Sequence, residues 1–175
     1  RLLPTALVLR LGARLAAALA CAHQQGVVHR DLKPSNVLVD LPSMGVKLLD
    51  FGVARIEDGQ QTRTGLTLGT PAYMAPEQLA GLPASPASDA YALGVVLFEM
   101  LTAQRPHGGA NLGELLRQVA EAPAADLASL RPELPRPAAL AVQQLLARDP
   151  QQRPADLAAW ARQAEHLAAG LSAAQ

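Results

Sequence analysis

Three polar side chains that suit phosphate chemistry lie close together in the sequence, at Asp31, Lys33 and Asn36. A carboxylate can accept the proton of a hydroxyl group, an amine can neutralise an anion, and an amide oxygen can bind a hard cation such as Mg²⁺. Asp50 follows a short apolar run, and pairing of that run with its neighbour would return this carboxylate to the same place. The spacing therefore predicts a magnesium-dependent phosphate site. The alternative on spacing alone is a solvated turn that carries incidental charges.

A helix and a hairpin are the elements that must position these side chains. Leucines recur at every fourth residue from Leu7 to Leu19, which predicts a helix over 5–25 that ends at Gly26. Two apolar runs flank a turn-forming segment at 40–45, and together they predict a hairpin. A long loop follows, and loops of that length are usually functional or disordered. Further helices are expected at 77–80, 89–101, 112–120, 137–147 and 154–171.

Composition and charge exclude several classes of protein. The chain has 175 residues, of which 50% are hydrophobic, and a formal net charge of zero. We therefore expect one domain of ordinary size and no nucleic-acid partner. The single cysteine, Cys21, excludes an internal disulfide. Arg10 and Arg14 interrupt the apolar stretch 6–22, so no membrane segment is expected in this chain.

Three motifs follow one another along the chain: HRDLKPSN at 29–36, DFG at 50–52 and APE at 75–77. In this order and at this spacing they resemble the C-terminal lobe of a eukaryotic-like (bacterial-type) serine/threonine protein kinase. The resemblance covers nearly the whole of 1–175 but only the second half of a kinase domain. It implies a mainly α (α+β) fold, a helical bundle with a small β-hairpin that carries the catalytic and metal-binding loops, and an activation segment at about 50–77.

The resemblance implies a role for each residue of the phosphate site. Asp31 would be the base that orients the substrate hydroxyl, and Lys33 would contact the γ-phosphate of ATP. Asn36 and Asp50 would bind the Mg²⁺ ions, and Leu38 would lie beneath the adenine ring.

Thr70 would be the third catalytic residue, because the resemblance directs its hydrogen bond toward the aspartate and lysine of the site. Thr70 lies in the segment GTPAY at 69–73, which together with the position of the lysine is typical of serine/threonine rather than tyrosine kinases.

Other residues would support the site. His29 and Phe51 would stack in an apolar spine that links the two lobes, next to Gly52, where the chain can turn sharply. Asp89 would hold the backbone of the histidine and of the arginine that follows it. A buried structural ion pair would join Glu77 to the arginine of the segment DPQQRP, Arg153.

Regulation is also implied. Arg30 would pair with a phosphate on the activation segment, since a phosphate adds nearly two negative charges and can order a loop against an arginine. Thr62 and Thr64 are the expected acceptors, and Thr67 is a competing one.

The sequence also departs from the family pattern. Residues 1–28 contain no lysine, no acidic residue and only two glycines, so the glycine-rich loop and the Lys–Glu pair of the N-terminal lobe are expected to lie outside this chain. That lobe would be a partner, and its absence would leave Leu38 and Phe51 exposed. Ala92 stands where a serine is usual, and the segment 105–108 lacks the usual Pro-Phe because His107 follows the proline.

The expected function is transfer of the γ-phosphate of ATP to serine or threonine hydroxyls of protein substrates, by a fragment of a longer cytoplasmic chain or one at the cytoplasmic face of a membrane. The alternative is a catalytically silent truncated lobe that acts as a protein-binding module. A small-molecule phosphotransferase of similar fold is disfavoured, because the segments 69–73 and 75–77 shape a platform for a polypeptide substrate.

Overall fold

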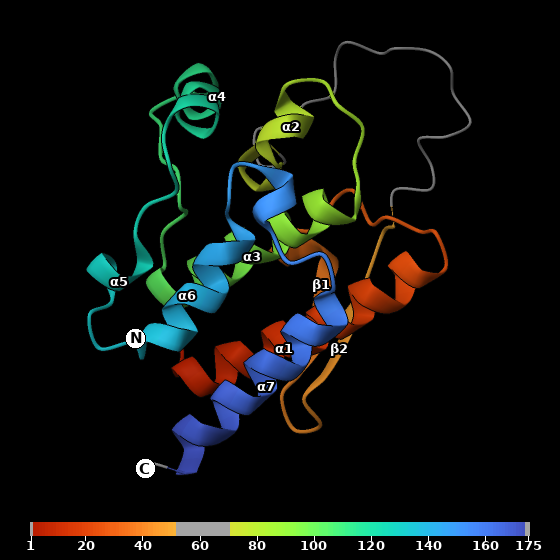
Figure 1. Ribbon diagram of the computed structural model, residues 1–175, viewed down its shortest axis with the longest axis vertical. Coiled ribbons are helices and arrows are strands. Elements are labelled where there is room, and N and C mark those ends of the chain that lie inside the picture. The colour runs from red at the N-terminus through yellow and green to blue at the C-terminus, as the bar shows by residue number, and fades with distance from the viewer. Residues whose placement is uncertain (1, 52–70, 174–175) are drawn as a thin grey trace.

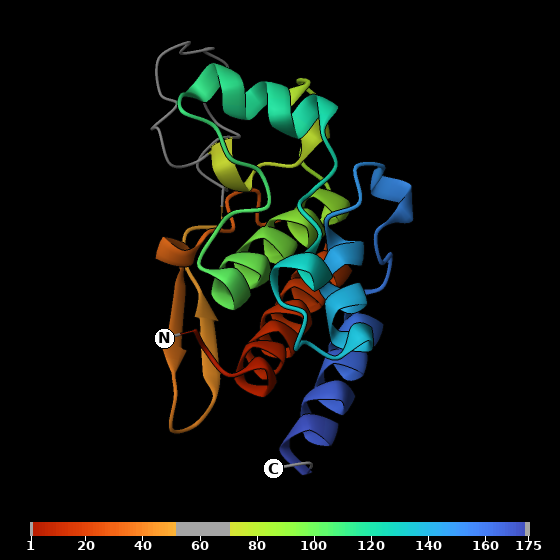
Figure 2. The same ribbon diagram turned by 90° about the vertical axis from the view of Figure 1, so that its left-hand side faces the viewer.

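The computed structural model describes residues 2–51 and 71–173. Helices dominate this part of the chain, and a single small hairpin lies at their side (Figures 1 and 2). The helices and strands are α1 (Thr5–Gln24), β1 (Val37–Asp40), β2 (Gly45–Leu48), α2 (Pro76–Leu79), α3 (Pro86–Thr102), α4 (Leu112–Glu121), α5 (Leu127–Leu130), α6 (Arg136–Leu145) and α7 (Leu157–Ala173). Three single turns of 3₁₀ helix lie at Pro34–Asn36, Pro71–Tyr73 and Pro150–Gln152.

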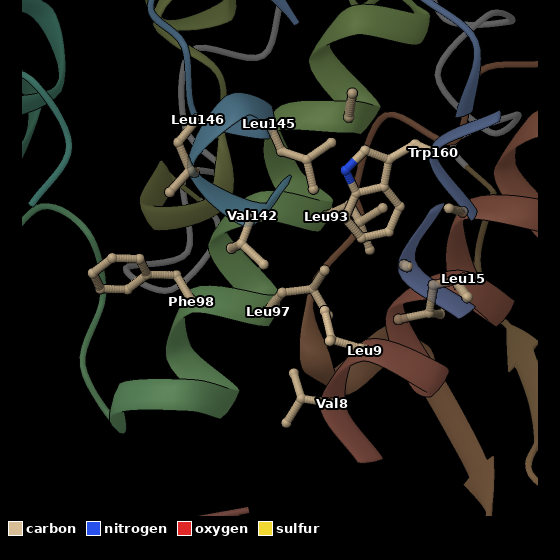
Figure 3. Close-up of a cluster of buried hydrophobic side chains, with 14 of the residues drawn as sticks. Val8, Leu9, Leu15, Leu93, Leu97, Phe98, Val142, Leu145, Leu146 and Trp160 are labelled. Carbon is tan, nitrogen blue, oxygen red and sulfur yellow. The ribbon is translucent and has the colours of Figure 1, made fainter. Parts of the chain in front are cut away.

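Helix α3 forms the centre of the core. It is buried along most of its length, and α1 and α6 pack against it, while α7 runs alongside α1 (Figures 1 and 2). Figure 3 shows where these helices meet, with Leu9 of α1, Leu97 of α3 and Trp160 of α7 in one apolar cluster. A mainly helical fold with a small hairpin is therefore what the structure contains, as the sequence predicted.

Two glycines permit the closest helix contacts. A Cβ atom on Gly12 would lie 2.8 Å from a methyl group of Leu97, and one on Gly94 would lie 2.8 Å from the Cβ of Leu145. Because real Cβ atoms do not approach other atoms so closely, α3 can lie this near to α1 and α6 only where these side chains are missing.

Helix α1 ends as its sequence predicts. Gly26 adopts a left-handed conformation with φ of 75°. Its N–H donates to the carbonyl of His23, and the N–H of Val27 donates to the carbonyl of Ala22. These two bonds form a Schellman motif, which satisfies carbonyl groups at the helix end and turns the chain toward residues 29–36.

The other expected helices are present, with shifted ends. Helix α3 begins before Asp89 because Ser85 caps it, accepting a bond from the N–H of Ser88. Helix α7 begins after Pro154 because Asp156 is its cap and accepts from the N–H of Ala159. The short helix α5 was not predicted.

The hairpin has one face on the core and one face in solvent. Strands β1 and β2 pair antiparallel, with Val37 opposite Leu48 and Asp40 opposite Gly45. Val37 and Leu48 pack against the core, whereas Leu38 on the opposite face is 55% exposed. The hairpin thus exposes Leu38 to solvent on the face where Lys47 lies opposite it.

Helix α1 is also long and apolar enough to cross a membrane by length and composition alone. In this structure one face of α1, including Leu9, Leu15 and Leu19, is buried among the other helices. Core helices meet the same length and hydropathy criteria as membrane spans.

Candidate active site

The polar loop, residues 29–36, leads from the end of α1 to β1. A buried carboxylate, that of Asp89, accepts hydrogen bonds from its backbone. Asp89 on α3 is 1% exposed; its Oδ2 accepts from the backbone N–H of His29 at 2.8 Å, and its Oδ1 accepts from the N–H of Arg30 at 3.0 Å. His23 on α1 also contacts Oδ2, with its Nε2 at 2.8 Å. The backbone contacts expected of Asp89 are therefore present, and the bond to His23 adds a third partner that the sequence analysis missed.

His29 joins the polar loop to the end of the hairpin. Its Nδ1 accepts from the N–H of Asp31 at 3.2 Å, so the proton of the neutral ring lies on Nε2, which donates to the carbonyl of Leu49 at 2.8 Å. The ring also packs on Phe51, with centroids 4.5 Å apart. Phe51 is half-buried rather than exposed because of this contact.

Three residues with phosphate chemistry converge on the polar loop. The Nζ of Lys33 lies 3.3 Å from Oδ2 of Asp31. Asn36 donates from Nδ2 to the backbone carbonyl of Asp31 at 2.8 Å and to its Oδ2 at 3.3 Å. The 3₁₀ turn Pro34–Asn36 makes this convergence possible, because it folds the amide side chain back over the aspartate.

Asp50 reaches the same region through the hairpin. The N–H of Leu49 donates to the backbone carbonyl of Asn36 at 2.9 Å, so the residue after Leu49 follows directly on a contact with the polar loop. Asp50 has φ of 52° and Arg30 has φ of 74°, conformations that non-glycine residues adopt rarely and that often mark functional sites.

The donor set fits a magnesium ion that also binds substrate phosphate. The Nδ2 of Asn36 donates to Asp31, and its Oδ1 has no protein partner among the described residues. Asp50 adds carboxylate oxygens nearby. Mg²⁺ usually takes few protein ligands and completes its shell with phosphate and water. No cluster of three or more His, Cys, Asp or Glu side chains occurs in the described part of the chain.

Arg153 holds together three segments behind the site. Its guanidinium group forms two bonds to the carboxylate of Glu77, at 2.6 and 2.9 Å, so the expected ion pair is present. It also donates to the carbonyl groups of Ala87, Ala147 and Arg148. Its carbon Cζ lies 5.0 Å from the centre of the Tyr91 ring, within the range of a cation–π contact.

Several predicted site residues lie outside the described residues: Gly52, Thr62, Thr64 and Thr70, together with Thr67. Two predicted site residues have not yet been placed: Arg30 is exposed, and Leu38 lies on the solvent-facing side of β1. The structure brings together Asp31, Lys33 and Asn36.

A further contact near the site was not predicted. The hydroxyl of Tyr73 donates to the carboxylate of Glu99 at 2.6 Å. Burial and the adjacent carboxylate together raise the pKa of Tyr73 above its usual value. Nothing local in the sequence signals this pair, which joins residues on separate elements.

Comparison with known proteins identifies the family. Residues 3–167 match the protein kinase domain. The chain is 43% identical over 155 residues to serine/threonine-protein kinase PknK of Mycobacterium bovis, covering 86% of this chain and 14% of that protein. It is 41% identical over 165 residues to serine/threonine-protein kinase PkaA of Streptomyces coelicolor, covering 92% of this chain and 28% of that protein.

A solved structure shows the same fold. The crystal structure of Rad53 1-466 in complex with AMP-PNP superposes with a TM-score of 0.72 and 25% identity, covering 91% of this chain and 41% of that one. The chain thus spans less than half the length of each of these proteins. Its ordered motifs, its helical lobe and these matches agree: the chain belongs to the protein kinase family and resembles the bacterial serine/threonine kinases.

Proposed function

We propose that this chain is the lobe of a serine/threonine protein kinase that carries the catalytic loop and binds the protein substrate. The observation that carries the proposal is the convergence of Asp31, Lys33 and Asn36 on one loop, with Lys33 at 3.3 Å and Asn36 at 3.3 Å from the same carboxylate oxygen. Phosphoryl transfer needs positioning and charge neutralisation more than covalent chemistry, and this arrangement supplies both.

Each side chain has a defined task in this proposal. Asp31 accepts a hydrogen bond from the substrate hydroxyl and orients its oxygen toward the γ-phosphate of ATP. Lys33 neutralises charge that develops on that phosphate, and Asn36 holds the backbone and carboxylate of Asp31 in place through Nδ2. Mg²⁺, bound by Asn36 and Asp50 with the phosphates of ATP, would supply further charge neutralisation.

A second lobe is needed to complete the nucleotide site. Leu38 of β1 is 55% exposed on the solvent-facing side of the hairpin, and Val39 and Leu41 nearby are 41% and 58% exposed; exposed apolar side chains grouped in this way favour association with another surface. We propose that the N-terminal lobe of a kinase covers this hairpin and that Leu38 then contacts the adenine ring. The chain without that lobe is expected to bind ATP weakly and to transfer phosphate at a negligible rate.

The test is transfer of labelled phosphate from ATP to a generic protein substrate, with the N-terminal lobe of PknK fused ahead of this chain. Asp31→Asn should lower the rate by about a hundredfold or more, because general base and positioning contributions are of that size. Asp40→Asn, at the exposed end of strand β1, is the matched control and should leave the rate unchanged.

Two outcomes would contradict the proposal. Wild-type activity in the Asp31→Asn fusion would remove Asp31 from the mechanism. A folded wild-type fusion that binds ATP and Mg²⁺ but transfers no phosphate to any protein would favour the alternative, a catalytically silent protein-binding module.

A further inference from the structure

A cavity of about 470 Å³ lies apart from the polar loop, among α2, α3, α4 and α6. Val119 of α4 and Leu146 after α6 contribute apolar walls, and Tyr91, His107 and Arg148 contribute polar groups. Pockets of about 300–1,000 Å³ with an apolar lining and a few convergent polar groups are the usual form of small-molecule sites.

His107 is the first sign that this cavity takes a polar ligand. His107 is only 7% exposed, yet neither of its ring nitrogens has a hydrogen-bond partner within the described part of the chain. Every fully buried side-chain nitrogen or oxygen among the described residues has a partner, so the ring nitrogens of His107 are accessible; the residue lines this cavity and a neighbouring one beside Tyr73 and Glu99. An accessible ring nitrogen without a protein partner can bond to water or to a ligand that occupies the space it faces.

Tyr91 provides a second unpaired group in the same wall. Its residue is 1% exposed, and its hydroxyl forms no hydrogen bond to the rest of the described chain. Its ring is held by the cation–π contact with Arg153. Burial raises the pKa of Tyr91 to about 12, so the hydroxyl stays protonated and can donate.

The charges around the cavity favour an anion. The guanidinium group of Arg148 forms no ion pair with any described residue. Glu121, the acid in the lining, already lies 3.4 Å from Arg117. The side-chain amide of Gln143 already has protein partners: its Nε2 donates to the carbonyl of Ala125, and its Oε1 accepts from the N–H of Leu127.

The cavity-lining groups without a protein partner are therefore mainly hydrogen-bond donors: a phenol, a neutral imidazole with one N–H, and a guanidinium. An oxygen ligand that accepts from all three, with a negative charge for the arginine, matches them. The walls around these groups are apolar, which suits a hydrocarbon body.

We propose that this cavity binds a small organic carboxylate. Its carboxylate oxygens accept hydrogen bonds from the hydroxyl of Tyr91 and the ring N–H of His107 and face the guanidinium of Arg148, while its apolar body packs against Val119 and Leu146. The site lies away from the polar loop, so the proposal is independent of the phosphoryl-transfer function.

The test uses the whole chain and three probes of equal length: octanoate, octanol and octylamine. Ligand-observed NMR titration should give a Kd of about 1 mM or tighter for octanoate, as expected for a ligand of this size. Octanol should bind at least about tenfold more weakly, because it lacks the charge that Arg148 recognises, and octylamine should not bind.

Variants locate the probe in the cavity. His107→Phe and Arg148→Gln should each weaken octanoate binding by at least about tenfold. His166→Phe and Arg162→Gln, both exposed on α7, are the matched controls and should bind as the wild type does. Tyr91→Phe keeps the ring and removes only the hydroxyl, so it tests the site even if another variant unfolds; thermal melting checks that each variant is folded.

Three results would overturn the proposal. One is the absence of saturable octanoate binding up to about 10 mM. Another is equal affinity for octanol and octanoate, which would leave no role for the carboxylate. The third is octanoate binding that survives both Tyr91→Phe and Arg148→Gln in folded protein, which would place the probe elsewhere.

Discussion

Arg153 and Glu77 lie 76 residues apart in the chain and meet in a two-pronged ion pair, with nitrogen–oxygen distances of 2.6 and 2.9 Å. The arginine side chain is fully buried and the glutamate nearly so. Because the same guanidinium also donates to three backbone carbonyls, the pair fixes α2 against the start of α3 and the segment after α6.

Removal of one partner from this pair should strongly destabilise the chain. Glu77→Gln leaves the buried guanidinium without a counter-charge, and breaking such a pair typically costs about 3–5 kcal/mol. Urea denaturation measures this free energy of unfolding. Glu121→Gln, which disrupts the exposed pair with Arg117, is the control and should change it by less than about 1 kcal/mol. Equal changes in the free energy of unfolding for the two substitutions would show that the buried pair stabilises the chain no more than the exposed pair.

Asp89→Asn should also destabilise the chain, although the two side chains have nearly the same size and shape. The asparagine keeps one acceptor oxygen but turns an NH₂ group toward a backbone N–H, so one of the bonds to His29 and Arg30 is lost in a buried place. Losing a buried charged acceptor is expected to cost about 1–3 kcal/mol. The same denaturation experiment with Asp40→Asn, at the exposed end of strand β1, should show almost no change. A wild-type midpoint for Asp89→Asn would mean that the carboxylate does not hold the polar loop.

Gly94→Ala should destabilise the contact between α3 and α6. The added Cβ would lie 2.8 Å from the Cβ of Leu145, so a helix must move, at a cost of about 1–3 kcal/mol. Gly170→Ala provides the opposite result, because no atom lies within 4 Å of that Cβ and alanine is the better helix former, worth up to about 1 kcal/mol. Thermal melting of the two variants should therefore shift in opposite directions, and a raised melting temperature for Gly94→Ala would rule out the close contact.

His107 should make stability depend on pH. Burial, with a smaller effect from Arg148, lowers the pKa of His107 below its usual 6.5 in the folded chain. The unfolded chain then takes up a proton first as the pH falls below about 6.5, so this contribution to stability is complete above that pH and is lost below it. Urea midpoints at about pH 7.5 and about pH 5 should differ less in His107→Gln than in the wild type. His166→Gln should keep the wild-type difference; if both variants keep it, His107 is not the group responsible.

Local sequence signals predicted the elements that carry the site. The leucine repeat of α1, the glycine that ends it and the turn at 40–45 each specify backbone structure over a few residues, and all three have the expected consequence. The predicted start of α3 at 89 was wrong because Ser85 caps the helix and starts it at Pro86, ahead of the apolar run on which the prediction relied. Helix α5 has only one turn, too short for any periodicity.

Contacts between distant segments were predictable only through the family resemblance. Nothing in the spacing of Glu77 and Arg153, or of Asp89 and His29, brings them together. The bond from His23 to Asp89 and the unpaired groups of the cavity around His107 escaped prediction, because they depend on how helices and loops from several parts of the chain pack. The roles proposed for Thr62, Thr64 and Thr70 stay predictions.

The buried carboxylate beneath the polar loop has a consequence for local motion. Surface loops usually open and close freely, with little relation to global unfolding. Here the amides of His29 and Arg30 are bonded to Asp89, which sits in the first turns of the central helix α3. These two amides can exchange with solvent hydrogen only after their bonds to Asp89 break, so we expect slow exchange in a segment that has no regular secondary structure.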